Sequence, residues 1–237
     1  MIYVGIDDTD VKDSPGTNQL ARWMIRQLRP DYESVVAIRH QLLFDPRIPY
    51  TSKNSSASLL FLPTAGGGVE DFAERARRLM RQWFVSGSDP GLCVTKEVPV
   101  ALTHFGRRCQ QEVVRQEEAR QLAARYSIHL EGLGGTEEGV IGAVAAVGLL
   151  AEGNDGRVVN VGVWPDDLSG PQDVALLHHR GVAEIRCLGS GQVIQSGCVD
   201  VGKHLRPNYR DGRIVLFVEP SQPETTGTAT WRAIRLS

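Results

Sequence analysis

Long hydrophobic runs are absent from this chain of 237 residues. No apolar stretch approaches the roughly 20 residues that a membrane-spanning helix needs. The N-terminus also lacks a charged leader followed by an apolar segment, because Asp7 interrupts the opening apolar run at once. We therefore expect a cytoplasmic protein that does not contact a membrane.

Cysteine is scarce and is not arranged in pairs. The four cysteines are Cys93, Cys109, Cys187 and Cys198, and no two of them form a Cys-x-x-Cys motif. Such spacing gives no support for a zinc ribbon, and so few cysteines in a chain of this length do not make a disulfide framework. We expect reduced thiols that pack as small hydrophobic side chains.

An excess of positive charge is also absent, since 26 Lys and Arg face 28 Asp and Glu for a net charge of −2. A general nucleic-acid coat needs a concentrated basic surface, so the composition argues against one. One basic cluster comprises Arg75, Arg77, Arg78 and Arg81. Because these arginines alternate with an apolar face, they are best explained as the solvated surface of a helix.

The hydrophobic content of 41% and the charged content of 23% are those of an ordinary globular chain with one or two domains. Runs rich in β-branched residues predict strands at 1–4, 35–44, 57–62, 92–94, 158–164, 183–188, 192–201 and 214–219. Apolar residues at helical spacing predict helices over 20–28, 69–83, 99–126 with a break near Gly106, 140–150 and 174–179. The pattern predicts an α/β (α+β) fold with a mixed sheet flanked by helices. We expect domains at 1–165 and 166–237, the second small and β-rich.

Acidic residues are concentrated directly after the first expected strand, where Asp7, Asp8 and Asp10 precede a loop and a helix. In open α/β sheets, ligands bind at the carboxyl ends of strands. Carboxylates crowded there repel one another unless a cation or a shared proton relieves them. Mg²⁺ is the natural candidate, because it takes hard oxygen ligands and arrives with phosphate. The alternative is a plain turn, with Ser14 as a helix N-cap and Pro15 at the first helical position.

A second candidate phosphate site is the glycine-rich stretch that includes Gly135, Thr136, Gly139 and Gly142. Glycines let a backbone approach a ligand closely, and the first turn of a helix offers unpaired N–H groups to phosphate. The stretch contains no Gly-Lys-Ser or Gly-Lys-Thr, so it is not a Walker A loop. Tight packing of a buried helix by small residues is an equally good interpretation and stays open.

The polar segment from Asp45 to Ser58 separates two expected strands, and we expect it to be a functional loop. Its basic residues, Arg47 and Lys53, are candidates to clamp a phosphate.

Several motifs together carry a family resemblance: Gly5–Asp10 with Thr17 seven residues on, Asp45–Tyr50, Asp89–Gly91 and Gly139–Gly148. They stand in the same order and at similar intervals in the archaeal tRNA-Ile agmatinylcytidine synthetases, or TiaS. From Met1 to about Trp164 the chain resembles the catalytic kinase-like domain of that family.

The resemblance implies an enzyme that uses ATP and Mg²⁺ to activate a cytidine carbonyl by phosphorylation, so that agmatine can displace it. Asp7, Asp8 and Asp10 match the acidic motif that handles metal and phosphate. Thr17 falls where the family has a threonine that becomes phosphorylated. We therefore expect Asp7, Asp8, Asp10 and Thr17 to be catalytic, with the same three aspartates as metal ligands. The expected nucleotide-binding residues are Thr9, Gly16, Lys53, Gly135, Thr136, Gly139 and Gly142.

Departures from the family bear on the substrate. The sequence shows no counterpart of the family's OB-fold and zinc ribbon, and Gly16–Gln19 stands in place of Cys-Thr-Thr-Tyr. Residues 51–56 replace a basic, glycine-bearing loop. These differences predict an ATP-dependent phosphotransferase or synthetase that acts on a small-molecule or nucleoside-like acceptor, which the sequence does not identify.

Alternatives stay open at this point. One is tRNA cytidine modification with a partner chain that supplies RNA binding, and another is a nucleotide-binding module without catalysis. A phosphohydrolase that uses Asp8 and Asp10 in the manner of haloacid dehalogenases fits less well, because it needs Thr or Val where Lys12 stands. The sequence also leaves a homodimer open.

Overall fold

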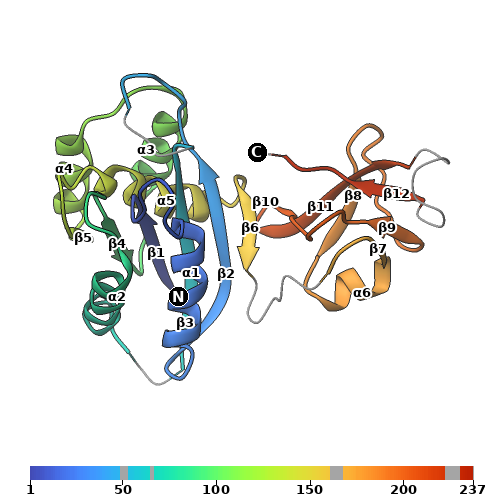
Figure 1. The fold of residues 1–237 in the computed structure, drawn as a ribbon, viewed down its shortest axis with the longest axis horizontal. Helices are drawn as coiled ribbons and strands as arrows, with labels where there is room; N and C mark the ends of the chain where they lie inside the picture. Colours follow the sequence, from blue (N-terminus) through green and yellow to red (C-terminus); the bar gives the residue numbers. More distant parts are fainter. Residues whose placement is uncertain (49–52, 65–66, 161–167, 222–229, 237) are drawn as a thin grey trace. The chain divides into compact units, whose positions relative to one another are not determined.

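The computed structural model describes residues 1–48, 53–64, 67–160, 168–221 and 230–236 (Figure 1). The chain divides into two compact units, Met1–Glu152 and Gly153–Ser237. Strands in the two units form both antiparallel and parallel pairs, and helices accompany them, so the predicted mixed α/β fold is confirmed. The expected functional boundary at residue 165 lies within the undescribed segment 161–167 and stays a prediction.

The first unit is built on a sheet with the strand order β5-β4-β1-β3-β2. Its strands are β1 (Ile2–Asp7), β2 (Tyr32–Gln41), β3 (Ser55–Pro63), β4 (Gly91–Thr95) and β5 (His129–Gly132). The central strand β1 pairs antiparallel with both β3 and β4, and β2 and β5 extend the sheet by further antiparallel pairs.

This topology explains why functional segments gather where the acidic loop follows β1. In the antiparallel arrangement, the end of β1 lies at the same edge as the beginnings of β3 and β4. The segment before β4 and the polar loop before β3 therefore approach the acidic loop from neighbouring strands. The edge gathers functional segments because the strand directions alternate, and not by the rule for parallel sheets.

Helices cover both faces of this sheet: α1 (Thr17–Leu28), α2 (Val69–Trp83), α3 (Val100–Gln111), α4 (Gln116–Arg125) and α5 (Gly139–Glu152). On one face, Gly5 of β1 lies directly against the backbone of Ala143 in α5. On the other face, Phe61 of β3 packs against Phe72 of α2 with ring centroids 5.1 Å apart. Alternate residues of β1 thus point to different helices, as the period of two requires.

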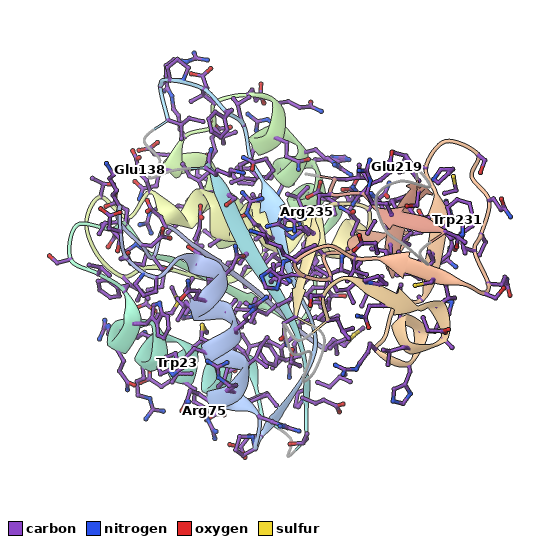
Figure 2. All side chains as sticks on the ribbon, turned by 45° about the vertical axis from the view of Figure 1, so that its right-hand side comes forward. Trp23, Arg75, Glu138, Glu219, Trp231 and Arg235 are labelled. Carbon is purple, nitrogen blue, oxygen red and sulfur yellow. The ribbon has the colours of Figure 1, made fainter. Side chains whose placement is uncertain are left out.

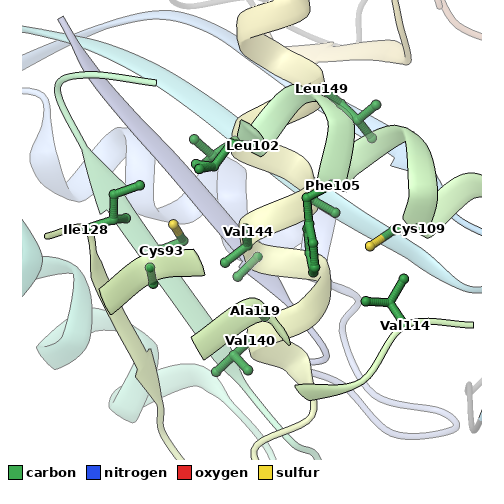
Figure 3. Packing of buried hydrophobic residues seen from close by; sticks show 14 of the residues in the cluster. Cys93, Leu102, Phe105, Cys109, Val114, Ala119, Ile128, Val140, Val144 and Leu149 are labelled. Carbon is green, nitrogen blue, oxygen red and sulfur yellow. The ribbon is translucent and has the colours of Figure 1, made fainter. Parts of the chain in front are cut away.

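The buried helix α5 forms the centre of a core cluster with α3 and β4 (Figure 3). Its side chains include Val140, Val144 and Leu149, which pack with Leu102 and Phe105 of α3. The helical region expected over 99–126 is present and is broken, but the break lies between Gln111, where α3 ends, and Gln116, where α4 begins. The break does not occur at Gly106.

Gly106 lies inside α3, where the backbone of α5 comes close. A Cβ at this position would lie 2.9 Å from both the carbonyl oxygen of Ala145 and Cγ of Leu149. The glycine therefore permits a close helix–helix contact and does not end the helix.

The second unit is smaller and β-rich, as predicted. Its strands are β6 (Arg157–Asn160), β7 (Pro171–Asp173), β8 (Glu184–Cys187), β9 (Cys198–Asp200), β10 (Asn208–Arg210), β11 (Arg213–Pro220) and β12 (Trp231–Ala233). They follow the order β6-β10-β11-β12-β9-β7, and β8 pairs in parallel with β11. The helix α6 (Val174–His179) packs on a core that includes Leu177, Ile185 and Val218. Residues 161–164 of the expected strand lie outside the described residues.

All four cysteines are free, and three of them are buried, as the sequence led us to expect. In the part of the chain that the structure describes, no helix combines the length and the apolar character needed to cross a membrane.

Candidate functional site

Asp7 is the last residue of β1, and its carboxylate lies on the first turn of α5. A Cβ at Gly142 would collide with Oδ2 of Asp7, so this glycine leaves the space that the carboxylate fills. Burial raises the pKa of Asp7 to about 8, and the neighbouring charges of Asp8 and Asp10 raise it further. The structure thereby brings together Asp7 and Gly142, two residues that sequence analysis placed in separate candidate sites.

Asp8 adopts a left-handed backbone conformation with φ of 50°, which Asp and Asn tolerate better than most residues. Burial raises the pKa of its carboxyl group to about 6. Repulsion from Asp89, Asp10 and Glu138 acts in the same direction, and a backbone hydrogen bond from Asp89 opposes it. Asp89 and Glu138 are therefore close enough to belong to the acidic site.

Sequence analysis did not name Asp89 or Glu138 as site residues. Asp89 stands in the Asp-Pro-Gly turn that belongs to the family resemblance, and this motif was the signal that could have identified it. Glu138 lies beside the candidate glycines and is far from Trp23 and the ion-paired Arg75 (Figure 2). The acidic edge thus lies away from the arginine-rich surface of α2.

Asp10 organises the entry into α1. Its Oδ1 accepts hydrogen bonds from the backbone N of Thr17 at 3.2 Å and from Oγ1 of Thr17 at 2.9 Å. Oγ1 of Thr9 donates to Oγ1 of Thr17 at 3.1 Å, and both threonine side chains are buried. Asp10 therefore satisfies one of the N–H groups that a helix N-terminus leaves unpaired.

The N-cap of α1 is Gly16, which has an extended backbone and provides no side-chain cap of its own. The alternative with Ser14 as N-cap and Pro15 at the first helical position is therefore wrong. Oγ of Ser14 instead accepts from N of Val11 and donates to O of Val11, both at 2.9 Å. The loop closes on itself, so the helix begins two residues later than a Ser-Pro start would place it.

The glycine-rich loop between β5 and α5 is joined to the turn before β4 by Asp89. Oδ1 of Asp89 accepts a hydrogen bond from the backbone N of Thr136, and O of Asp89 accepts from N of Gly139 at 3.0 Å. Gly135 has φ of 61°, and a Cβ there would collide with the same carboxylate. One aspartate thus determines the path of the loop that precedes α5.

Helix α4 holds this loop from its outer side. Nε2 of Gln116 donates to O of Thr136 at 3.1 Å and to O of Glu137 at 2.8 Å. Arg120 forms an ion pair with Glu137, whose backbone is in the left-handed region with φ of 63°. Gln116 and Arg120 are therefore positioning residues for the start of α5, and nothing in the sequence pattern marked them.

The basic candidates of the polar loop differ from each other in their surroundings. Arg47 pairs with Asp45 at 2.8 Å on the surface, and its hydrogen bonds lower the pKa of Asp45 to about 2. Its guanidinium is thus already engaged with a carboxylate. Lys53 is exposed just before β3, next to Asn54, whose carbonyl accepts from N of Leu42 at 2.9 Å. Residues 49–52 of this loop lie outside the described residues.

Within the described residues, no group of three or more His, Cys, Asp or Glu side chains is arranged to hold a metal ion. Burial first, and then the charges of neighbouring acids, raises the pKa of Asp7 and of Asp8, so a bound cation would stabilise their charged forms. Mg²⁺ is usually held by one or two carboxylates together with phosphate oxygens and water. The acidic loop therefore fits a cation that arrives with phosphate, and it does not form a complete protein cage.

Fold and site together define an α/β domain in which partly buried carboxylates face a glycine-rich helix start. The chain matches no protein-family model. It is 29% identical over 154 residues to the tRNA(Ile2) 2-agmatinylcytidine synthetase TiaS of Archaeoglobus fulgidus, which covers 64% of this chain and 36% of the relative. The TiaS of Pyrococcus horikoshii is 26% identical over 157 residues, covering 62% of this chain and 35% of the relative.

Solved structures agree with these sequence matches. A tRNA fluorescent labeling enzyme has a TM-score of 0.54 at 26% identity, and the match covers 62% of this chain and 35% of that one. A TiaS–tRNA(Ile2)–ATP complex has a TM-score of 0.54 at 24% identity, covers 62% of this chain and 36% of the other, and shows a shared fold. The predicted resemblance to part of TiaS is confirmed, and the chain spans little more than a third of the length of these relatives.

Proposed function

We propose that the first unit is the catalytic part of an ATP-dependent enzyme of the TiaS type, which modifies a cytidine of tRNA. The observation that carries the proposal is the contact between Asp7 and Gly142. It joins the acidic motif to the glycine-rich helix start, and the resemblance to TiaS rests on both segments. Sequence likeness alone does not require these two segments to touch.

Phosphoryl transfer asks little covalent chemistry of a protein and depends mainly on positioning and charge stabilisation. At this edge, the N-terminal turn of α5 offers backbone N–H groups and the positive end of its dipole to phosphate. The path of the loop before α5 is held by Asp89 and Gln116. A nucleotide bound here would meet a preorganised backbone, with Gly135, Thr136 and Gly139 nearest to its phosphates.

Mg²⁺ belongs to the proposal, with Asp7 and Asp8 as its first ligands and Asp10 beside them. When bound, the ion would neutralise charge on the phosphate oxygens. Burial and the neighbouring acids raise the pKa of Asp7 more than that of Asp8, so Asp7 gains most from such a cation. Asp10 already accepts two hydrogen bonds from Thr17, which favours a structural contribution from this residue.

Phosphorylation of Thr17 stays a prediction. Its hydroxyl donates to Asp10 and accepts from Thr9 in the interior of the loop. A covalent step at this oxygen would require the loop to open and the bond to Asp10 to break. Incubation with γ-labelled ATP followed by peptide mapping tests the step directly, and turnover without label at Thr17 would leave it as a helix-start residue.

The printed names of the relatives describe a tRNA substrate, and they lend no support to the expected small-molecule acceptor. We therefore propose a tRNA cytidine as the acceptor. The slightly acidic composition still favours help with RNA binding from elsewhere, whether from a partner chain or another segment. A nucleotide-binding module without turnover is the second candidate, because residues 51–56 replace the family's basic, glycine-bearing loop.

The test compares Asp8→Asn with Asp13→Asn. Asn tolerates the left-handed backbone that both positions adopt, so both variants should fold. ATP hydrolysis and tRNA labelling would be followed with Mg²⁺, agmatine and a tRNA transcript. We expect turnover to fall at least about 100-fold in Asp8→Asn, the scale of losing one preorganised electrostatic group, and to be unchanged in Asp13→Asn. Nucleotide binding with no turnover in the wild type would favour the module without catalysis.

A further inference from the structure

Arg39 of β2 is a buried cation with no acidic partner in the part of the chain that the structure describes. The residue is 9% exposed, and burial lowers the pKa of its guanidinium. Its hydrogen-bond partner is a neutral amide, since Nη2 donates to Oε1 of Gln41 at 2.9 Å. Among the described residues, no carboxylate lies within ion-pair distance of Arg39. A charge removed from water without a counter-ion destabilises a folded protein by several kcal/mol.

Other arginines of the first unit contrast with Arg39. They are more exposed, and each forms an ion pair with a carboxylate: Arg47, Arg75, Arg77, Arg78, Arg81, Arg107, Arg108 and Arg120. In the described part of the first unit, these eight more exposed arginines are paired with carboxylates, whereas Arg39, the most buried arginine, is not. This distribution is the reverse of what stability alone would favour, and it indicates an anion that is not part of the protein.

Gln41 holds the guanidinium in a defined direction. Its Nε2 donates to O of Asn54 at 2.6 Å and to O of Leu42 at 3.1 Å, so its Oε1 is turned to Arg39. Nε2 of Gln110 in α3 donates to O of Gln41 at 3.1 Å and fixes the backbone there. Gln41 is thus a positioning residue, and the fork of Arg39 keeps further N–H donors for a planar or tetrahedral anion.

The sheet register places Arg39 at the edge that carries the acidic loop. Arg39 pairs with Ala57, and Ala57 pairs with Ile6, the residue before Asp7. Neighbouring strands lie about 4.8 Å apart, so the Cα atoms of Arg39 and Ile6 are separated by about 10 Å. These three residues share the face covered by α1, because Gly5 faces α5. The first turn of α1 begins at the same edge.

We infer that Arg39, oriented by Gln41, binds a phosphate group of the nucleotide at this edge of the sheet. The inference rests on the proposed function, because ATP is taken as the source of the phosphate. Arg suits this task better than Lys, since its planar fork can bind two phosphate oxygens at once. The acidic loop would hold the cation of the nucleotide complex, and Arg39 of β2, two strands away from β1, would meet its negative charge at the same edge.

The experiment measures ATP affinity by calorimetry with Mg²⁺ present and the urea midpoint of unfolding, in the whole chain. Arg39→Met removes the charge but keeps a long apolar side chain, and exposed Arg26→Met is the matched control. We expect Arg39→Met to weaken ATP binding by about tenfold to a hundredfold, the loss of a charge-assisted hydrogen-bond pair. Its unfolding midpoint should equal or exceed that of the wild type, because an uncompensated buried charge is removed. Arg26→Met should change neither quantity.

A structural role for Arg39 predicts the opposite pattern, with a lower unfolding midpoint and unaltered ATP affinity, and that result would overturn the inference. Should Arg39→Met fail to fold, Arg39→Lys decides: severalfold weaker ATP binding at a native midpoint supports the inference, and native affinity refutes it. A tRNA transcript without ATP is the second arm. Weaker tRNA binding with native ATP affinity would assign the phosphate to RNA and overturn the nucleotide assignment. Absence of ATP binding in the wild type would instead refute the proposed function.

Discussion

The carboxylate of Asp7 occupies the space above Gly142 that any larger residue at position 142 would need. This relationship joins the end of β1 to the first turn of α5. It also accounts for the raised pKa of Asp7, because the contact with the helix takes the carboxylate out of water. A glycine is required here by the neighbour it faces, since its own backbone conformation is helical.

Gly142→Ala is expected to destabilise the protein by about 1–3 kcal/mol, the usual effect of forcing an extra methyl group into a packed site. Urea unfolding measures the change. Gly189→Ala is the control, because a Cβ at that position meets nothing within 4 Å. The double variant with Asp7→Gly should recover much of the loss, since it removes the carboxylate that the new methyl group strikes. Equal stability of Gly142→Ala and the wild type would refute the contact.

Asp7 should make the metal-free protein less stable as pH rises. The pKa of Asp7 is about 8 in the folded chain, against 3.8 for the ordinary group. Between these values the folded protein keeps a proton that the unfolded chain has released, so the free energy of unfolding falls with increasing pH. The stabilising contribution is complete below pH 3.8 and is lost by about pH 8. Asp8 acts in the same direction up to about pH 6.

Asp7→Asn isolates this effect, because the amide has nearly the same shape and does not titrate. Between pH 6 and pH 8.5 the wild type should lose stability by at most about 1.4 kcal/mol per pH unit relative to the variant. Urea midpoints at several pH values provide the measurement. Asp45→Asn is the control, since the pKa of Asp45 is lowered to about 2 and its titration ends well below this range. Parallel pH profiles of the wild type and Asp7→Asn would contradict the assignment.

Thr17→Val should destabilise the entry to α1 by about 1–3 kcal/mol, because it removes the hydroxyl donor to Asp10 and leaves the hydroxyl of Thr9 without its acceptor. Thr17→Ser keeps the hydroxyl and should lose much less. Thermal or urea unfolding of the two variants distinguishes a hydrogen-bonding role from simple packing. If Ser proves as damaging as Val, the methyl group of Thr17 matters and the hydroxyl does not.

Gln116→Ala should loosen the loop before α5 without unfolding the domain. The two hydrogen bonds to Thr136 and Glu137 are each worth about 0.5–1.5 kcal/mol. Amide hydrogen exchange at residues 135–138 should therefore accelerate by about tenfold, and global stability should change little. Gln121→Ala, an exposed position on the same helix, is the control. Unaltered exchange in Gln116→Ala would show that Asp89 and Arg120 hold the loop without Gln116.

Sequence patterns predicted the helices and strands well where apolar residues recurred regularly over many positions. Phe72, Ala76 and Met80 recur at helical spacing in α2, and the structure buries all three. The break between α3 and α4 was misplaced. Glycine often interrupts a helix, but Gly106 is present because the backbone of α5 packs closely against it. Local pattern cannot distinguish a glycine that ends a helix from one that admits a neighbour.

The site was predictable in part. Asp7, Asp8 and Asp10 stand together in the sequence, and the glycines before α5 formed a recognisable cluster. Their partner Asp89 joins them only through the antiparallel pairing of β1 with β4, and strand register is not visible in one sequence. Arg39 was missed for the same reason, since an arginine in a strand is unremarkable until its burial and its lack of a carboxylate are known.

Helix α5 makes direct backbone contacts with its neighbours. Gly5 of β1 lies against Ala143, Gly91 of β4 against Gly139, and Gly148 against Leu102 of α3. No side chains separate these backbones, so no substitution can tune the spacing by adding or removing a methyl group without collision. Helix α5 and the sheet that it covers therefore form one rigid unit. Any attempt to redesign what this protein accepts has to work through the surrounding loops, where size and shape are still adjustable.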